Sequence, residues 1–152
     1  VVKANRGEIA ALAGAEGAVR GVESVGDHAD AGDHAAALAR ETGAAVVASG
    51  ATDLVATPDA EVYEVDAGHP AMGEAVGTGC MLGGTCAAFA GAMDDRGEAA
   101  LAATLAFGLA GETAAEWDYR GPGSYLVNFH DAVARLEPPA DADQRISPHG
   151  GG

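Results

Sequence analysis

The stretch Val76-Gly77-Thr78-Gly79-Cys80-Met81-Leu82-Gly83-Gly84 joins a glycine turn to the start of an apolar helix rich in small residues. Gly77 and Gly79 permit backbone angles that other residues resist. The unpaired N–H groups of a helix's first turn, with the positive end of the helix dipole, favour an anion. We therefore expect the backbone of Thr78 and Gly79 to form an anion-binding turn, with Cys80 projecting beside the anion. Taken alone, such a string is more often a helix that merely follows a flexible turn.

Composition restricts the class of protein. The chain has 152 residues, of which 48% are hydrophobic, and this favours one folded domain. Its 23 acidic and 8 basic residues give a formal charge of -15, which repels nucleic acid and anionic membranes. No apolar run approaches the roughly 20 residues that cross a bilayer. We expect neither nucleic acid nor a membrane as a partner.

The basic residues and the cysteines indicate the environment. Lys3 is the only lysine, and with the excess of acid this favours a salt-loving cytoplasm. At about 1 M salt the Debye length falls to about 3 Å, so repulsion between surface carboxylates is screened. An ordinary acidic protein from a GC-rich genome is the alternative. Cys80 and Cys86 have neither the spacing of a metal pair nor that of a disulfide framework, so we expect reduced thiols and a cytoplasmic location.

Helical and strand-like segments alternate in the first part of the chain. Residues 29–42 have the pattern of a helix that Gly43 ends, and residues 44–50 that of a buried strand, which together are typical of an α/β protein. Residues 53–57 and 61–65 predict two short paired strands. A polar loop over residues 66–76 then leads to the glycine turn.

The second part of the chain is predicted to be helical. The expected helices cover residues 80–93, 97–117 and 122–136, and the first two are so apolar that we expect each to be packed on more than one face. Residues 138–152 have little to bury, which predicts a disordered tail. We expect residues 1–137 to form the C-terminal portion of a single domain. Because the chain opens without methionine, on the end of a strand, we also expect an N-terminal portion to be missing.

Three polar turns follow strand-like segments, at residues 3–8, 49–50 and 77–80. In open α/β sheets, ligands bind beyond the carboxyl ends of the strands, so these turns are expected to meet at one crevice. They bring a lysine, a hydroxyl, a carboxylate and a glycine turn, which are the parts that a nucleotide phosphate site uses.

Several motifs in order resemble the hydroxyethylthiazole kinase family. The resemblance is carried by Gly68-His69-Pro70-Ala71-Met72 with the 76–83 turn, by Asn5 with Glu8-Ile9, by Gly21-Val22-Glu23-Ser24 and by Gly121-Pro122-Gly123-Ser124-Tyr125. It runs from about Val1 to Leu136, and motifs in a shared order are far more specific than any one of them.

The resemblance implies a fold and an activity. The family has a ribokinase-like three-layer α/β fold, which would be incomplete in this chain. Its members transfer the γ-phosphoryl group of ATP to the primary hydroxyl of 4-methyl-5-(2-hydroxyethyl)thiazole in thiamine biosynthesis. They use Mg²⁺ and assemble as homotrimers with sites between subunits.

The resemblance also implies roles for single residues. Cys80 matches the catalytic position, Gly77 a glycine that contacts the thiazole, Ser49 a hydroxyl residue that contacts ATP, and Glu8 an acid associated with the metal. Lys3 falls where the family has a phosphate-contacting arginine. A lysine still neutralises a phosphate but lacks the two-pronged fork of arginine.

The sequence departs from the family in two further respects. Ala4 stands where the family has glycine, and nothing here matches the thiazole contacts or the Asp-Pro-Val-Gly element of the family's N-terminal half. Two alternatives therefore stay open. The first is another ribokinase-like kinase, such as a hydroxymethylpyrimidine phosphate kinase, and the second is a non-catalytic nucleotide-binding or assembly fragment.

Overall fold

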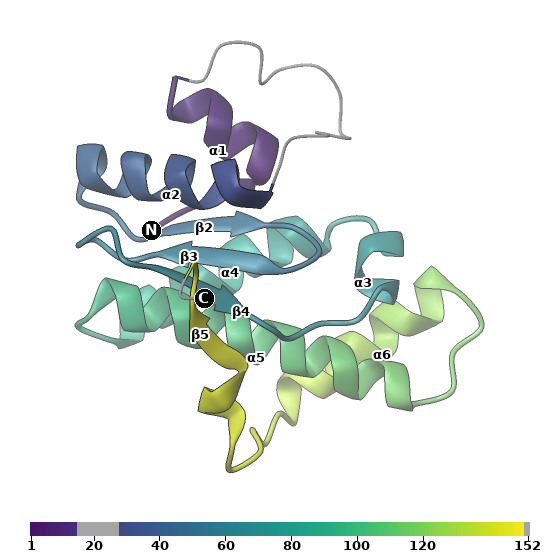
Figure 1. Cartoon of the computed structure of the whole chain (residues 1–152). Helices are drawn as coiled ribbons and strands as arrows, with labels where there is room; N and C mark the ends of the chain where they lie inside the picture. Colours follow the sequence, from purple (N-terminus) through teal and green to yellow (C-terminus); the bar gives the residue numbers. More distant parts are fainter. Residues whose placement is uncertain (15–27, 151–152) are drawn as a thin grey trace.

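A mixed β-sheet lies between two groups of helices in the computed structural model, which describes residues 1–14 and 28–150 (Figure 1). The strands follow one another across the sheet in chain order: β1 (Val2–Asn5), β2 (Val46–Ser49), β3 (Asp53–Ala56), β4 (Val62–Val65) and β5 (Ile146–Pro148). β1 is parallel to β2, and the other neighbours are antiparallel.

Helices cover both faces of this sheet. α1 (Arg6–Leu12) and α2 (His28–Thr42) lie on one face, and α4 (Thr78–Ala92) and α5 (Arg96–Glu116) lie on the other (Figure 1). The remaining helices are α3 (Ala71–Glu74), α6 (Pro122–Ala134), which packs on α5, and the 3₁₀ turn η1 (Ala142–Arg145). The predicted three-layer α/β arrangement is confirmed.

Alternation along the strands divides the apolar residues between two cores. Val46 and Ala48 face the α1–α2 side, while Val47 between them faces the α4–α5 side. Leu54 and Val55 of β3 divide in the same way, because successive strand side chains point to opposite faces. Both faces of the central strands are therefore buried.

The α1 helix begins directly after β1 through a capping box. The side chain of Asn5 accepts a hydrogen bond from the Glu8 amide at 2.8 Å, and the Glu8 carboxylate accepts one from the Asn5 amide at 2.9 Å. These two bonds satisfy donors that a helix leaves unpaired at its start. The polar turn expected at residues 3–8 is therefore a strand end followed at once by a helix.

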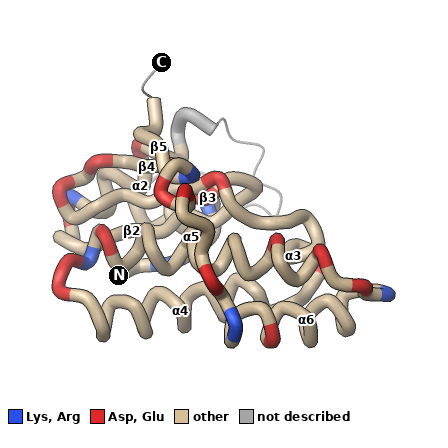
Figure 2. Tube along the Cα trace, turned by 90° about the horizontal axis from the view of Figure 1, so that it is seen from below, with Lys and Arg blue, Asp and Glu red and all other residues tan. Residues whose placement is uncertain are grey.

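The two apolar helices differ in their burial. α5 is buried along most of its length, as expected. α4 has no charged residue and is drawn in one colour throughout (Figure 2), yet its buried residues are Leu82 and Cys86 alone. Gly84, Ala87 and Ala88 are exposed, so the prediction that α4 is packed on several faces is wrong for the described chain.

The tail expected to be disordered is ordered over residues 142–148. Here η1 leads into β5, which pairs with β4 and places Ile146 opposite Val65. Leu136, Ala142 and Ile146 pack against the main core. The prediction is wrong for these residues because the open edge of β4 supplies hydrogen bonds that no local sequence pattern indicates.

The loop predicted over residues 66–76 contains the short helix α3, which the sequence pattern did not indicate. The motif Gly21-Val22-Glu23-Ser24 lies outside the described residues. Within the described ranges, the helices are too short or too polar to cross a membrane.

Candidate functional site

A cavity of about 520 Å³ opens at the carboxyl end of β2. Five parts of the chain form its wall: the β2–β3 turn, the loop before α3, α3 itself, the first turns of α4, and one side chain of α5. The residues that line it are Ser49, Gly50, Ala51, Asp53, Ala67, Gly68, His69, Pro70, Met72, Gly73, Thr78, Gly79, Leu82 and Phe107. The structure thus brings together Ser49, Thr78 and Gly79 from the predicted site.

The β2–β3 turn supplies the polar side of the cavity. The Ser49 hydroxyl donates to the carbonyl of Ala4 at 3.3 Å, and the Gly50 amide donates to the Asp53 carboxylate at 2.9 Å. Burial raises the pKa of Asp53 above its usual value, against the lowering effects of the Gly50 hydrogen bond and of Lys3 and Arg6. A carboxyl group that the sequence reasoning missed therefore lies in the cavity wall.

Gly77 provides the sharp turn into α4. Its φ of 102° is in the region that glycine adopts readily, and it caps the helix without a side-chain hydrogen bond. The Thr78 hydroxyl donates to the carbonyls of Met72 at 2.9 Å and Ala75 at 3.2 Å, which ties α3 to the start of α4. The backbone of this turn, rather than the Thr78 hydroxyl, is therefore the part suited to an anion.

Lys3 reaches across from β1 to this turn. Its Nζ lies 3.3 Å from the position that a Cβ on Gly79 would occupy, and its Cδ lies 4.0 Å from the corresponding position on Gly83. The lysine stem thus lies along a face of α4 that carries no side chains at these two positions. An ammonium group and the positive end of a helix dipole meet at one place, which favours an anion there.

The other predicted site residues lie apart from the cavity wall. Cys80 is exposed and follows Gly79 directly, and Gly77 is also exposed, but neither lines the cavity. Glu8 uses its carboxylate in the capping box of α1. Among the described residues, no three His, Cys, Asp or Glu side chains are grouped to hold a metal ion. Cys86 is buried, and this burial raises the pKa of its thiol.

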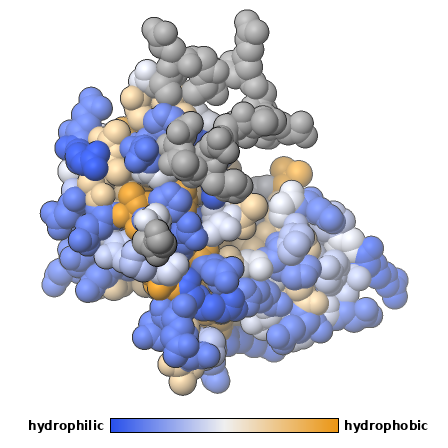
Figure 3. Space-filling model, in the orientation of Figure 1, coloured by the Kyte–Doolittle hydropathy of each residue, from blue (hydrophilic) through white to orange (hydrophobic). Residues whose placement is uncertain are grey.

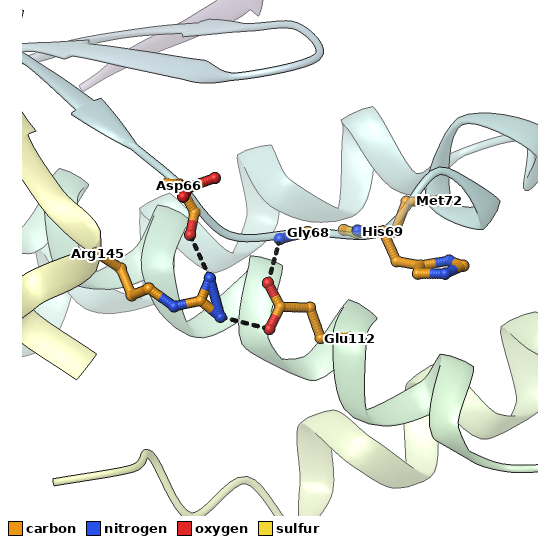
Figure 4. Close-up of polar contacts among 6 residues, drawn as sticks. All are labelled: Asp66, Gly68, His69, Met72, Glu112 and Arg145. Atoms are coloured by element: carbon orange, nitrogen blue, oxygen red, sulfur yellow. Dashed lines mark hydrogen bonds and ion pairs between the residues drawn. The ribbon is translucent and has the colours of Figure 1, made fainter. Parts of the chain in front are cut away.

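The loop before α3 forms another part of the cavity wall. Its Gly68 amide donates to Glu112 of α5 at 3.0 Å, and the same carboxylate pairs with Arg145 at 2.6 Å (Figure 4). The His69 ring accepts from the Ala71 amide at 3.2 Å and so caps α3. Sequence reasoning missed Glu112 and Arg145, whose partners are distant in the chain. For Asp53, its spacing of three from Gly50 was an available signal.

Known proteins resemble this chain over almost its whole length. Residues 1–138 match the Hydroxyethylthiazole kinase family. The hydroxyethylthiazole kinases of Haloquadratum walsbyi and Natronomonas pharaonis are 51% and 54% identical to it, over 97% and 93% of this chain and 53% and 51% of their own lengths.

The fold has a solved counterpart. The structure of a hydroxyethylthiazole kinase protein from Pyrococcus horikoshii OT3 superposes with a TM-score of 0.75 at 31% identity, covering 95% of this chain and 53% of that one. The chain spans about half the length of the curated relatives it matches. Its α/β fold accordingly matches part of that ribokinase-like structure, as the sequence predicted. On the family match, the identities and the fold together, this chain belongs to the hydroxyethylthiazole kinase family.

Proposed function

We propose that this chain contributes to an ATP-dependent kinase that phosphorylates the primary hydroxyl of 4-methyl-5-(2-hydroxyethyl)thiazole in thiamine biosynthesis. The observation that carries the proposal is the meeting of Lys3 with Gly79 at the first turn of α4, beside a cavity of about 520 Å³. Positive charge and the first-turn amides of a helix at one point suit the transfer of a phosphoryl group, for which positioning and charge neutralisation supply most of the catalysis.

The lining of the cavity suits both parts of the thiazole alcohol. Met72, Leu82 and Phe107 supply apolar surface for the methylthiazole ring. Ser49 and the backbone of Gly79 supply polar groups that would hold the hydroxyl and the transferring phosphoryl group. We propose contacts of Lys3 and Ser49 with ATP and of Gly77 with the thiazole, in line with the resemblance.

Cys80 is our proposed general base. Its thiol is exposed one residue beyond Gly79, where it could receive the proton of the substrate hydroxyl. We assign the larger share of catalysis to the backbone amides of Thr78 and Gly79, because charge stabilisation usually exceeds proton transfer in phosphoryl-transfer enzymes.

Mg²⁺ is proposed to enter with ATP. This ion keeps several waters and is commonly held by one or two carboxylates together with substrate phosphates. The described residues fit that mode and not an all-protein cage: Asp53 is the carboxylate in the cavity wall, and the Glu8 carboxylate would have to leave the capping box to bind a metal. When bound, the ion would neutralise charge on the phosphates.

The decisive experiment is an assay for ADP. We would supply ATP, Mg²⁺ and the thiazole alcohol at high salt to this chain and to a form extended upstream to the length of the relatives. Hydroxymethylpyrimidine phosphate replaces the thiazole alcohol in a parallel reaction. Thiazole-dependent ADP from either form supports the proposal. ADP from the extended form alone would make this chain inactive by itself, while a preference for the pyrimidine, or no ADP from either form, would reject it.

The assembly and environment are also proposals. We infer a homotrimer from the resemblance, to be tested by light scattering on the eluted protein. We propose that the protein works in the cytoplasm of a halophile. The support is its charge of -15, its two free thiols and the largely hydrophilic face in Figure 3. The melting temperature should then rise between 0.1 M and 2 M KCl, and a fall would contradict this.

A further inference from the structure

Arg145 connects the C-terminal segment to the wall of the cavity. It lies beyond residues 1–138, which match the family, yet it makes three hydrogen bonds to residues near the cavity. Its backbone carbonyl accepts from the Asp66 amide at 2.8 Å, its Nη1 donates to the Asp66 carbonyl at 2.7 Å, and its Nη2 pairs with Glu112 at 2.6 Å (Figure 4). One residue thus fixes both Asp66 and Glu112.

Glu112 connects Arg145 to the loop before α3. One carboxylate oxygen binds Arg145, and the other accepts the Gly68 amide at 3.0 Å. The Glu112 side chain is 30% exposed and the Arg145 side chain is 36% exposed. Without Arg145, the Glu112 carboxylate would therefore be free to turn toward water. The guanidinium fork therefore determines whether the carboxylate faces the loop.

The path of the loop also depends on Gly68 and on Gly108 of α5. Gly68 has a φ of +134°, which L side chains rarely adopt. The loop reaches α5 because Gly108 has no side chain: a Cβ there would stand 2.6 Å from the Cβ of Ala67. Ala67, Gly68, His69 and Pro70 are successive residues of the cavity wall, so a shift of this backbone changes the cavity directly.

We propose that Arg145 is a positioning residue: acting through Glu112 and Asp66, it holds the loop of residues 66–70 in the shape that forms part of the wall of the cavity in which the thiazole alcohol is proposed to bind. The identity of the ligand rests on the proposed function above. The effect on the loop does not, because it follows from the hydrogen bonds alone.

Amide hydrogen exchange tests the effect on the loop in the 152-residue chain at high salt. Arg145→Ala should speed exchange at residues 68–72 by about tenfold, since the Gly68 amide loses a fixed acceptor. Arg145→Lys should give an intermediate rate, because one ammonium cannot replace the fork. Arg135→Ala removes the same charge at the exposed end of α6 and should leave these amides unchanged. Exchange in Arg145→Ala within twofold of the parent rate overturns the proposal.

Kinetics test the consequence for the cavity in whichever form makes ADP. Arg145→Ala should raise KM for the thiazole alcohol at least fivefold with kcat changed less than twofold, and Arg145→Lys should recover part of this loss. A fall in kcat with KM unchanged overturns the positioning role. If no form makes ADP, the proposed function fails while the exchange result still decides the effect on the loop.

A second variant covers the case in which Arg145→Ala does not fold. Glu112→Gln removes the ion pair but keeps an amide oxygen that can accept from Gly68. It should raise the exchange rate at residues 68–72 less than tenfold but more than twofold, and parent-like exchange would overturn the proposal.

Discussion

The Nζ of Lys3 lies 3.3 Å from the point where a Cβ on Gly79 would stand. β1 and the first turn of α4 can approach this closely because position 79 has no side chain. The contact joins residues 76 positions apart in the sequence, and it concentrates positive charge at the start of the helix.

Gly79→Val should reduce kcat/KM by roughly 100-fold, the scale of losing one preorganised backbone donor. The branched side chain would displace the Lys3 ammonium and cover the first-turn amides. Cys80→Ser should reduce kcat/KM less than Gly79→Val does. Steady-state kinetics of the two variants measure this difference. Gly84→Ala is the matched control, since nothing lies within 4 Å of its Cβ position in the same helix. Equal losses from Gly79→Val and Cys80→Ser would reject the division of labour proposed for this turn.

Lys3→Gln should raise KM for ATP by roughly tenfold, the equivalent of one charge-assisted hydrogen bond. Lys3→Arg should retain ATP binding, because the family has arginine here and a guanidinium can hold phosphate with two donors. Arg40→Gln on the exposed side of α2 removes the same charge far from α4 and serves as the control. A KM for ATP in Lys3→Gln equal to that of the control would exclude a phosphate contact.

Asp53→Asn tests the buried carboxyl through the pH dependence of stability. Burial raises the pKa of Asp53 above 3.8, so the folded state binds its proton more tightly than the unfolded chain does. Ionisation of Asp53 is therefore less favourable in the folded protein than in the unfolded chain. The free energy of unfolding falls as pH rises from 3.8 through the higher pKa of the folded state, and it stays lower at higher pH. Asp53→Asn keeps an oxygen for the Gly50 amide, so we expect it to gain stability over the parent protein at pH 7, with a smaller gain near pH 4.

Denaturant unfolding at the two pH values measures this gain. Asp131→Asn is the control, because it makes the same change of side chain on the exposed side of α6, away from the cavity wall. An Asp53→Asn protein that is less stable than the parent at pH 7 would show instead that the ionised carboxylate stabilises the turn.

Tyr125→Phe should cost about 1–2 kcal/mol of unfolding free energy, because the buried hydroxyl donates to the Gly111 carbonyl at 2.9 Å and this hydrogen bond would be lost. The edge contact with Tyr119 would remain. Burial raises the pKa of Tyr125 to about 12, so stability should decline as pH rises above 10, where the unfolded chain ionises first. Denaturant unfolding measures the loss of unfolding free energy in Tyr125→Phe, and Tyr63→Phe in β4 is the comparison variant. Equal stabilities of the two variants would contradict the role of the bond between Tyr125 and Gly111.

Local pattern was sufficient for most elements. The helix ended by Gly43, the paired strands over residues 53–65 and the three long helices follow from apolar periodicity and glycine or proline punctuation. Ser49 and Gly79 were assigned to one site on the expectation that polar turns after strands gather at one edge of the sheet. In the structure Ser49 does end β2, whereas Gly79 follows α3 at the start of α4.

The remaining contacts could not be read from local pattern. Arg145 binds Asp66 across 79 positions and Glu112 across 33, and β5 pairs with β4 although residues 138–152 carry no strand pattern. The resemblance associates Glu8 with the metal, and its role in the capping box was recognised only from the two hydrogen bonds with Asn5.

The sequence by itself determined the alternation of helices and strands, the acidic character and the glycine turn at residues 77–80, because each depends on the backbone preferences or charges of nearby residues. Only the tertiary structure decided that Lys3 meets Gly79, that Asp53 lies half-buried in the cavity wall and that Arg145 contacts both Asp66 and Glu112. These relationships depend on chain segments that meet only after the sheet and its two helical layers have packed, and local preferences carry no information about such distant partners.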